Sequence, residues 1–195
     1  AEKALQASEA RFRTIFDSVG DAIFIHDATT GEIVDVNQSM SRMFGYAPEK
    51  ARQLNVADLS AGDPPWSQTE AMEWIRRARE EGPQTFDWLS RDSDSRIFWT
   101  AVAMRAAELD GQERILVAVR DITDRKRAEA SLRQANAELS AWVSALERRE
   151  RESAVLRETS ELLQASTGAD EAYAVVKSAL SRLFPGSTGA LFVLR

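Results

Sequence analysis

The sequence predicts an α+β fold, in which a five-stranded antiparallel sheet carries helices on one face and is followed by a long helix and a truncated second α+β domain. Two short apolar segments precede several amphipathic stretches, and three further strand-like segments follow them. Asp110 and Gly111 form a strong hairpin signal between the last two of these segments. From residue 124 onward, the apolar residues adopt the seven-residue spacing of a coiled coil.

The composition restricts the classes of function. Hydrophobic residues make up 44% of the 195 residues and charged residues 29%, which is enough for a packed core. The formal net charge of −6 argues against a nucleic-acid partner or an anionic lipid surface. Cysteine is absent, which excludes disulfides and thiolate ligands and is typical of a cytoplasmic compartment. No apolar run approaches the ~20 residues of a membrane span. Because the first residue is not Met, we expect a fragment, which leaves open a membrane segment outside it.

The N-terminal region predicts a helix followed by a hairpin. Residues 1–19 carry apolar side chains at helical spacing, and Gly20 ends the helix. Residues 22–25 form a short apolar run that suits a strand buried on both faces. Gly31 can adopt the positive φ that a turn requires, so residues 32–36 are expected to pair with that strand.

Three helices are expected next. Asn37 suits the N-cap of the first, because its side chain can accept hydrogen bonds from free amides, and Gly45 suits its C-terminal end. Pro48 fits the first turn of a second short helix. Ser67 and Glu70 have the spacing of a capping box and open the third helix.

The first domain is completed by three strands. They are predicted over residues 85–90, 96–105 and 114–120. With them, the domain spans residues 20–123, and the N-terminal helix at 1–19 precedes it.

The region after residue 123 predicts a coiled-coil helix over residues 124–152 that forms a homodimer with a second copy of the chain. Its seam is a set of apolar residues that continues past that helix: Leu132, Leu139, Trp142, Leu146, Leu156 and Leu163. Arg149 and Ser153 occupy seam positions, so the seam is weak around Glu147 to Ser153.

Residues 153–195 predict the beginning of a second domain. Gly168 breaks the helix, and Thr167 or Asp170 is placed to cap the next one. Residues 190–194 have the composition of a strand.

Four segments of the first domain occur in a characteristic order: Ser8 to Phe16, Gly31 to Asn37, Met43-Phe44-Gly45-Tyr46 and Asp121 to Lys126. In this order, the region from about residue 10 to about residue 125 resembles a PAS domain, the sensory-box family, and implies a PAS fold. The sequence departs from the pattern at Arg91-Asp92-Ser93, where a Lys-Asp-Gly turn is more usual. Ser93 tolerates a positive φ less well than glycine does.

Residues 153–194 resemble the opening of a GAF domain, with two helices and a first strand joined through Phe184 to Leu191. Together, the resemblances imply a sensory input module of a bacterial-type signalling protein. In such chains, a PAS unit, a connecting helix and a GAF unit often precede a diguanylate cyclase or a histidine kinase. No output motif lies within these residues, so we expect this chain not to be an enzyme.

His26 is the single histidine, and we interpret it as a structural or surface residue. A metal or haem site needs further ligands. Haem-binding PAS domains usually supply their histidine from the long helix within the domain, and the corresponding helix here, Ser67 to Glu81, has none. The sequence therefore predicts no metal site and argues against haem. The acidic pairs lack a nucleophile, a base and an oxyanion site, so no catalytic residue is predicted.

Large side chains in the predicted domain are candidates for a ligand pocket: Met40, Phe44, Trp74, Trp88 and Trp99. Light-sensing PAS relatives bond flavin through a cysteine, which this chain lacks. Non-covalent flavin stays open, with Trp66 and the other tryptophans as an aromatic wall. We favour core packing of these side chains over a bound cofactor. Besides flavin, an unknown small molecule is the other candidate ligand.

The change from strand to helix falls at Asp121-Ile122-Thr123, and we predict a signal joint there. The side chains of Asp121 and Thr123 can bond free backbone groups and so fix the direction in which the helix leaves. The leading hypothesis is a non-enzymatic sensor and dimerisation fragment. The alternatives are a constitutive protein–protein interaction module without ligand, and an enzyme completed by residues outside this chain.

Overall fold

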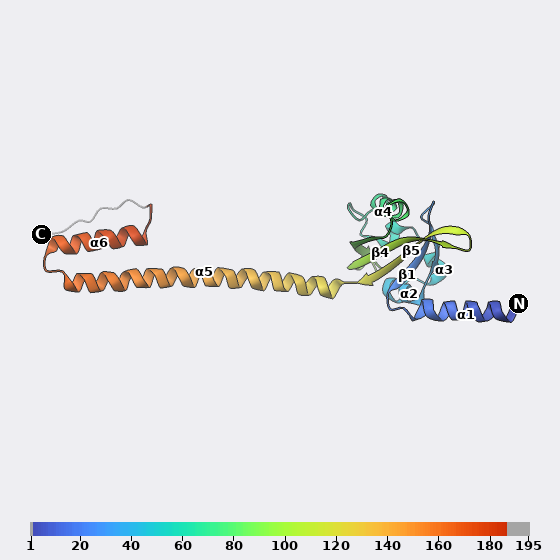
Figure 1. Cartoon of the computed structure of the whole chain (residues 1–195), viewed down its shortest axis with the longest axis horizontal. Coiled ribbons are helices and arrows are strands. Elements are labelled where there is room, and N and C mark those ends of the chain that lie inside the picture. The colour runs from blue at the N-terminus through green and yellow to red at the C-terminus, as the bar shows by residue number, and fades with distance from the viewer. Residues whose placement is uncertain (1, 187–195) are drawn as a thin grey trace. The chain divides into compact units, whose positions relative to one another are not determined.

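The computed structural model describes residues 2–186 (Figure 1). The chain divides into two compact units, Ala1–Glu129 and Ala130–Arg195. The first unit contains a single antiparallel sheet with the strand order β2-β1-β5-β4-β3. The strands are β1 (Ala22–Asp27), β2 (Ile33–Val36), β3 (Gln84–Arg91), β4 (Ile97–Leu109) and β5 (Gln112–Asp121). The predicted five-stranded α+β fold is therefore confirmed.

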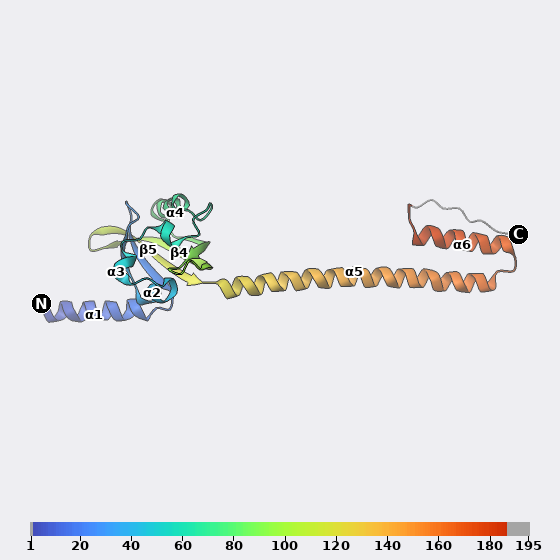
Figure 2. The same ribbon diagram turned by 180° about the vertical axis from the view of Figure 1, so that it is seen from behind.

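Helices lie on both sides of this sheet. They are α1 (Glu2–Ser18), α2 (Gln38–Phe44), α3 (Pro48–Ala51), the 3-10 helix η1 (Val56–Leu59) and α4 (Gln68–Glu80). Figures 1 and 2 show α4 on one side of the sheet and α1 on the other. Phe12 and Phe16 of α1 line a shallow groove with Ile23 and Ile25 of β1. The prediction of helices on one face thus holds for the segment between β2 and β3, and α1 is the exception.

The core lies between the helices that follow β2 and the sheet face turned toward them, which we call the inner face. Alternation along the strands places every second side chain there. Phe24 of β1, Phe98 of β4 and Val117 of β5 are all buried against α2 and α4.

Asn37 holds three elements together. It is fully buried at the N-cap of α2, where its Oδ1 accepts from the amides of Met40 (3.0 Å) and Ile23 (2.9 Å). Its Nδ2 donates to the carbonyls of Phe16 and Asp21, each at 3.0 Å. The predicted cap is confirmed, and its side chain also fixes the entry into β1.

The β4–β5 hairpin is longer than predicted. Asp110 and Gly111 both have positive φ, which is the geometry of a two-residue hairpin turn. The ladder therefore continues to the pair Leu109 and Gln112 directly beside the turn. The predicted strands, one ending at residue 105 and the other beginning at residue 114, were too short. The charged and small residues of the outer hairpin lack strand-like alternation, so the sequence did not indicate them as strand.

The turn between β3 and β4 adopts an unexpected geometry. Positive φ falls on Ser95 (64°) and not on Ser93. The amide of Ser93 instead donates to the carbonyl of Phe44 at 2.9 Å, which closes the end of α2. Ser93 therefore needs no positive φ, because the strained position of the turn lies two residues later, at Ser95.

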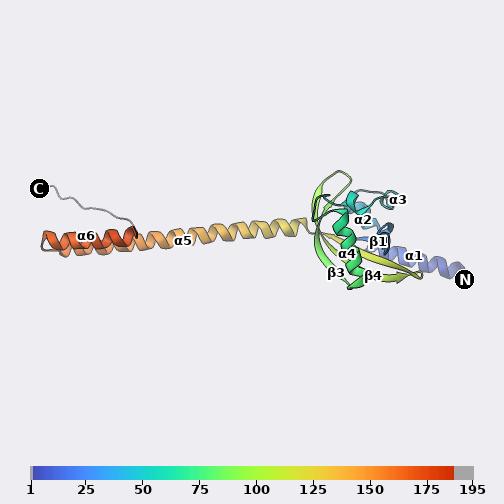
Figure 3. The ribbon, with the colours of Figure 1, turned by 90° about the horizontal axis from the view of Figure 1, so that it is seen from above.

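The second unit consists of the greater part of α5 (Thr123–Ala165) and of α6 (Ala169–Leu183). These helices lie side by side (Figures 1 and 3) and bury Val155 and Ala179. Arg182 pairs with Glu158 at 2.7 Å.

The connection between α5 and α6 differs from the prediction. Gly168 occupies the N-cap of α6 without a side-chain hydrogen bond, so neither predicted cap residue performs that role. Instead, the carboxylate of Glu171 accepts from the amide of Thr167 at 3.0 Å. The strand predicted at 190–194 lies outside the described residues. None of the described helices combines the length and apolar character of a membrane span.

Candidate ligand cavity and helix junction

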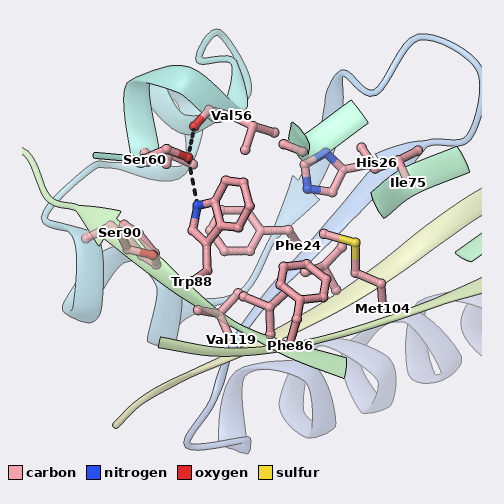
Figure 4. Close-up of a pocket in the computed structure, with 15 residues that line it drawn as sticks. Phe24, His26, Val56, Ser60, Ile75, Phe86, Trp88, Ser90, Met104 and Val119 are labelled. Carbon is pink, nitrogen blue, oxygen red and sulfur yellow. Dashed lines mark hydrogen bonds between the residues drawn. The ribbon is translucent and has the colours of Figure 1, made fainter. Parts of the chain in front are cut away.

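A cavity of about 50 Å³ lies between the inner face of the sheet and the helices (Figure 4). Its wall is mainly aromatic and aliphatic and includes Phe24, Phe44, Phe86, Trp88, Met104 and Val117. These residues come from four strands and α2, so the fold itself forms the cavity. A space of this kind suits a small, largely apolar molecule.

The polar side chains of the wall are hydrogen-bonded to one another. Trp88 donates through Nε1 to Oγ of Ser60 at 2.9 Å, and Ser60 donates to the carbonyl of Val56 at 2.7 Å (Figure 4). Oγ of Ser90 lies 2.9 Å from Oγ1 of Thr100, which donates to the carbonyl of Trp88 at 3.2 Å. The first chain holds the indole N–H of Trp88, and the second holds its backbone carbonyl.

His26 contributes the remaining polar side chain of the wall. It is 4% exposed, and its Nδ1 lies 2.9 Å from the carbonyl of Gly31. Burial lowers the pKa of His26, although the bond to Gly31 acts in the opposite direction. The ring is therefore neutral near pH 7. Of the two alternatives from the sequence, a structural or a surface residue, its burial supports the structural one.

The predicted pocket residues separate into two groups. Phe44 and Trp88 line the cavity, and Met40 is fully buried in the core without lining it. Trp74 stacks on the outside of Phe86, with 4.1 Å between ring centroids. Trp99 lies on the other face of β4, because its neighbour Phe98 occupies the inward position.

The structure also places residues in the cavity wall that the sequence analysis did not select. Phe24, Phe86 and Met104 belong to strands whose other inward residues are buried. Period-two alternation, applied to each strand, would have found them.

The predicted signal joint is tied to β4. The amide of Ile122 donates to the carbonyl of Trp99 at 2.9 Å, and Oγ1 of Thr123 accepts from the Trp99 amide at 3.1 Å. Oδ1 of Asp121 accepts from the Thr123 amide at 2.8 Å. Both predicted side chains thus bond backbone groups where β5 ends, and the partner strand β4 was not foreseen. The role of these residues in signalling stays a prediction.

A second connection runs from the first turns of α5 to β3. Lys126 places Nζ 2.6 Å from Oδ2 of Asp87, and Arg125 places Nη2 3.5 Å from Oδ1 of the same carboxylate. Lys126 Nζ also lies 5.1 Å from the centre of the Trp99 ring. The beginning of the helix is therefore held by two strands of the sheet.

The described residues contain no group of three or more histidine, aspartate or glutamate side chains arranged to hold a metal ion.

Comparisons with known proteins agree with this fold. Residues 20–124 match the PAS domain family. The chain is 31% identical over 143 residues to the methyl sulfide methyltransferase-associated sensor of Methanosarcina acetivorans, covering 73% of this chain and 14% of that protein. It is 26% identical over 140 residues to the sensor histidine kinase TmoS of Ectopseudomonas mendocina, covering 70% of this chain and 14% of that protein.

Among solved structures, the PAS domain of an HTR-like protein from Haloarcula marismortui has a TM-score of 0.56 at 22% identity. The similarity covers 62% of this chain and 97% of that one, and it concerns the fold alone. The chain thus spans about one seventh of the two curated relatives, each of which is a sensor. The match over residues 20–124, more than half of the sequence, establishes that the chain belongs to the PAS domain family.

Proposed function

We propose that this chain is the sensory input and dimerisation part of a larger signal-transduction protein. The PAS fold and the two sensor relatives support a sensory role. A stimulus at the cavity would change the sheet, the sheet would change the junction, and α5 would carry the change to a downstream domain.

One observation carries this proposal: strand β3 contacts the cavity and the helix junction with adjacent residues. Phe86 and Trp88 line the cavity, and Asp87 between them binds Lys126 at the start of α5. Neighbouring residues of a strand point to opposite faces but share one backbone. A displacement of the cavity wall on β3 would therefore move Asp87 with it. This arrangement is a short physical connection between two sites.

The exposed seam of α5 supports a homodimer. All six predicted seam residues are exposed in the chain by itself, and Trp142 is 77% exposed. A row of apolar side chains at seven-residue spacing is stable in water when a second helix covers it. The polar seam positions Arg149 and Ser153 lower the cost of a second packing arrangement, which a signalling helix requires.

The downstream domain in this proposal is a histidine kinase or a diguanylate cyclase, reached through a GAF domain that begins in the second unit. One relative is a sensor histidine kinase, which favours the first of these outputs. The resemblance of residues 153–194 to the opening of a GAF domain supports the GAF domain in this proposal.

The cavity volume favours a small occupant over a cofactor. Roughly 10–15 Å³ measured in this way holds one water molecule, so about 50 Å³ corresponds to a few non-hydrogen atoms. A flavin ring system or a haem is several times larger. We therefore expect the purified protein to be colourless, and visible absorption would contradict this part of the proposal.

A constitutive interaction module is the second candidate, and the small size and internally bonded wall of the cavity favour it. The oligomeric state tests the dimerisation part of the proposal. Light scattering should give a dimer at high micromolar concentration, and Leu139→Glu should shift it to monomer by placing charge in the seam. Leu162→Glu changes an exposed leucine of the same helix outside the seam and should leave the dimer intact. A strictly monomeric wild-type chain would overturn the dimerisation proposal.

A further inference from the structure

The segment from Ser60 to Trp66 follows the free edge of the sheet. Strand β3 is the last strand in the sheet order, so its outer edge has no neighbouring strand among the described residues. Ser60 forms an antiparallel bridge with Ser90 there, and the amide of Ala61 donates to the carbonyl of Leu89 at 3.0 Å. We call residues 60–66 the edge strap, because their beginning is bonded to the backbone of β3.

The first residue of the edge strap contacts the cavity wall. Ser60 is completely buried, and its Oγ accepts from Nε1 of Trp88 at 2.9 Å (Figure 4). The same hydroxyl donates to the carbonyl of Val56 at 2.7 Å. A buried indole N–H that loses its acceptor is unfavourable, so the position of Ser60 depends on that of the Trp88 ring.

The last residue of the edge strap contacts the helix junction. The ring of Trp66 meets the ring of Trp99 edge to face, with 5.7 Å between the centroids and 85° between the planes. Trp99 is the β4 residue whose backbone bonds both Ile122 and Thr123. Nζ of Lys126 lies 5.1 Å from the centre of the Trp99 ring. The edge strap therefore joins the inner face of the sheet to its other face around the edge of β3.

Between its ends, the edge strap forms a compact turn. The amide of Trp66 donates to the carbonyl of Asp63 at 2.8 Å, and the amide of Gly62 donates to the carbonyl of Trp66 at 3.2 Å. Gly62 has a φ of 102°, which a residue with a side chain rarely adopts. Residues 62–65 are exposed, so these backbone bonds set the span of the turn. A turn closed by its own hydrogen bonds can carry a movement from one end to the other.

We propose that the edge strap is a second connection between the cavity wall and the start of α5, in which Trp66 positions Trp99 at the junction. A displacement of Trp88 would move Ser60, and the turn would carry this movement around β3 to the junction. The connection does not include Asp87, so it is independent of the ion pairs at that carboxylate. The inference rests on the proposed function, because it describes how a change in the cavity reaches the junction of the same protein.

The test gives the edge strap slack in its exposed part. Two glycines are inserted between Gly62 and Asp63, which lengthens the turn and leaves the residues at both ends unchanged. Exposed loops tolerate such insertions well. A second change, Ser60→Ala, perturbs the cavity end by removing the acceptor of the Trp88 indole. Combining the two shows whether a change at the cavity reaches the junction through an intact strap.

The readout is the hydrogen-exchange rate of the Ile122 amide, measured by NMR in the full 195-residue chain. This amide donates to the carbonyl of Trp99, so its exchange reports opening of the junction. We expect Ser60→Ala to raise the rate at least about threefold with the unaltered strap, and less than about 1.5-fold with the insertion. The Ile23 amide, which donates to Asn37, reports global unfolding and should respond equally in both chains.

A matched insertion controls for the added length. The same two glycines placed between Thr29 and Thr30 lie in the exposed turn of the β1–β2 hairpin. This chain should keep the response of Ile122 to Ser60→Ala at about threefold. A loss of the response there as well would overturn the assignment to the strap.

Tryptophan variants test the end of the edge strap at the junction. Trp66→Phe keeps an aromatic ring against Trp99 and should keep the response to Ser60→Ala, whereas Trp66→Ala should reduce it as the insertion does. Trp74→Ala removes another half-buried tryptophan, which stacks on Phe86, and should keep the response. A response that persists in Trp66→Ala would overturn the role of Trp66.

Equal responses to Ser60→Ala with and without the insertion would overturn the edge strap as a connection, and so would no response in either chain. Both results leave β3 and Asp87 as the path. Where Ser60→Ala does not fold, Ser60→Cys weakens the same acceptor, and the same comparison decides. The dimerisation part of the proposed function fails separately, on a monomeric chain in the light-scattering experiment.

Discussion

At the scale of single residues, Asn37 is the most constrained polar side chain of the first unit. It makes four hydrogen bonds to backbone groups of α1, β1, α2 and the loop before β1, and it is completely buried. We expect Asn37→Ala to lower the free energy of unfolding by about 3 kcal/mol, because it leaves buried donors and acceptors unpaired. Urea denaturation measures this change.

The matched variant at this site is Asn37→Asp. It keeps an oxygen for the amides of Ile23 and Met40 but turns a second oxygen toward the carbonyls of Phe16 and Asp21. It should be destabilised as well. An aspartate variant as stable as the wild type would show that the two carbonyl bonds contribute nothing.

Ser95 carries local backbone strain. Its φ of 64° lies in the left-handed region, in an exposed turn. Ser95→Gly should raise the stability by about 0.5 kcal/mol, the balance of relieved strain and added unfolded-state entropy. Ser93→Gly, two residues earlier at ordinary φ, should lower it. Thermal unfolding compares the two, and the opposite order would contradict the turn geometry.

His26 gives the fold a defined pH dependence. The unfolded chain binds a proton on His26 below its ordinary pKa of 6.5, and the folded chain binds it only at lower pH because burial lowers the pKa. The stabilising effect of a neutral His26 is thus complete above that value and declines as the pH falls below it. His26 is the single histidine, so His26→Phe should remove the decline in urea midpoints just below pH 6.5. An unchanged decline would show that carboxylates cause it.

At the scale of elements, local chemistry predicted where most helices and turns begin and end. Asn37, Gly45 and the Ser67–Glu70 capping box perform the expected roles. Such signals are readable because they depend on residues only a few positions apart. The full length of β4 and β5 was not readable, because their outer pairing depends on a partner strand.

The cavity was only partly predictable for a related reason. Residue size identified Phe44 and Trp88, but size does not say which face of an element a side chain occupies. Phe98 and Trp99 are adjacent and both large, and only the packing of the whole sheet decides that Phe98 points inward. The contact of His26 with the carbonyl of Gly31 is likewise indicated by no sequence pattern.

The junction between sheet and helix makes a prediction at this scale. Asp87→Asn removes the carboxylate that binds Lys126 and Arg125. Exposed pairs contribute less than about 1 kcal/mol, so global stability should change little. Hydrogen exchange of the Lys126 amide should instead become faster. Glu113→Gln, which breaks the exposed pair between Glu113 and Arg79, is the matched control and should not affect that amide.

At the scale of the whole chain, the PAS fold places a small cavity and the start of a long helix on opposite faces of the same strand. Trp88 on β3 and Trp99 on β4 illustrate the division, because one lines the cavity and the other anchors the junction. In the proposed function, the exposed apolar side chains further along α5 are the surface on which a change at its start would act. The central claim is that β3 carries the state of the cavity to the junction.

Making the same substitution at two places in the cavity wall tests that claim most directly. Phe86→Leu changes the wall on β3, and Phe44→Leu makes the same substitution on α2. The measurement is the backbone amide shift and exchange rate of Lys126 in the full chain. We predict a clear change for Phe86→Leu and a much smaller one for Phe44→Leu, because only the first lies beside Asp87. Equal responses, or none from either variant, would contradict transmission through β3.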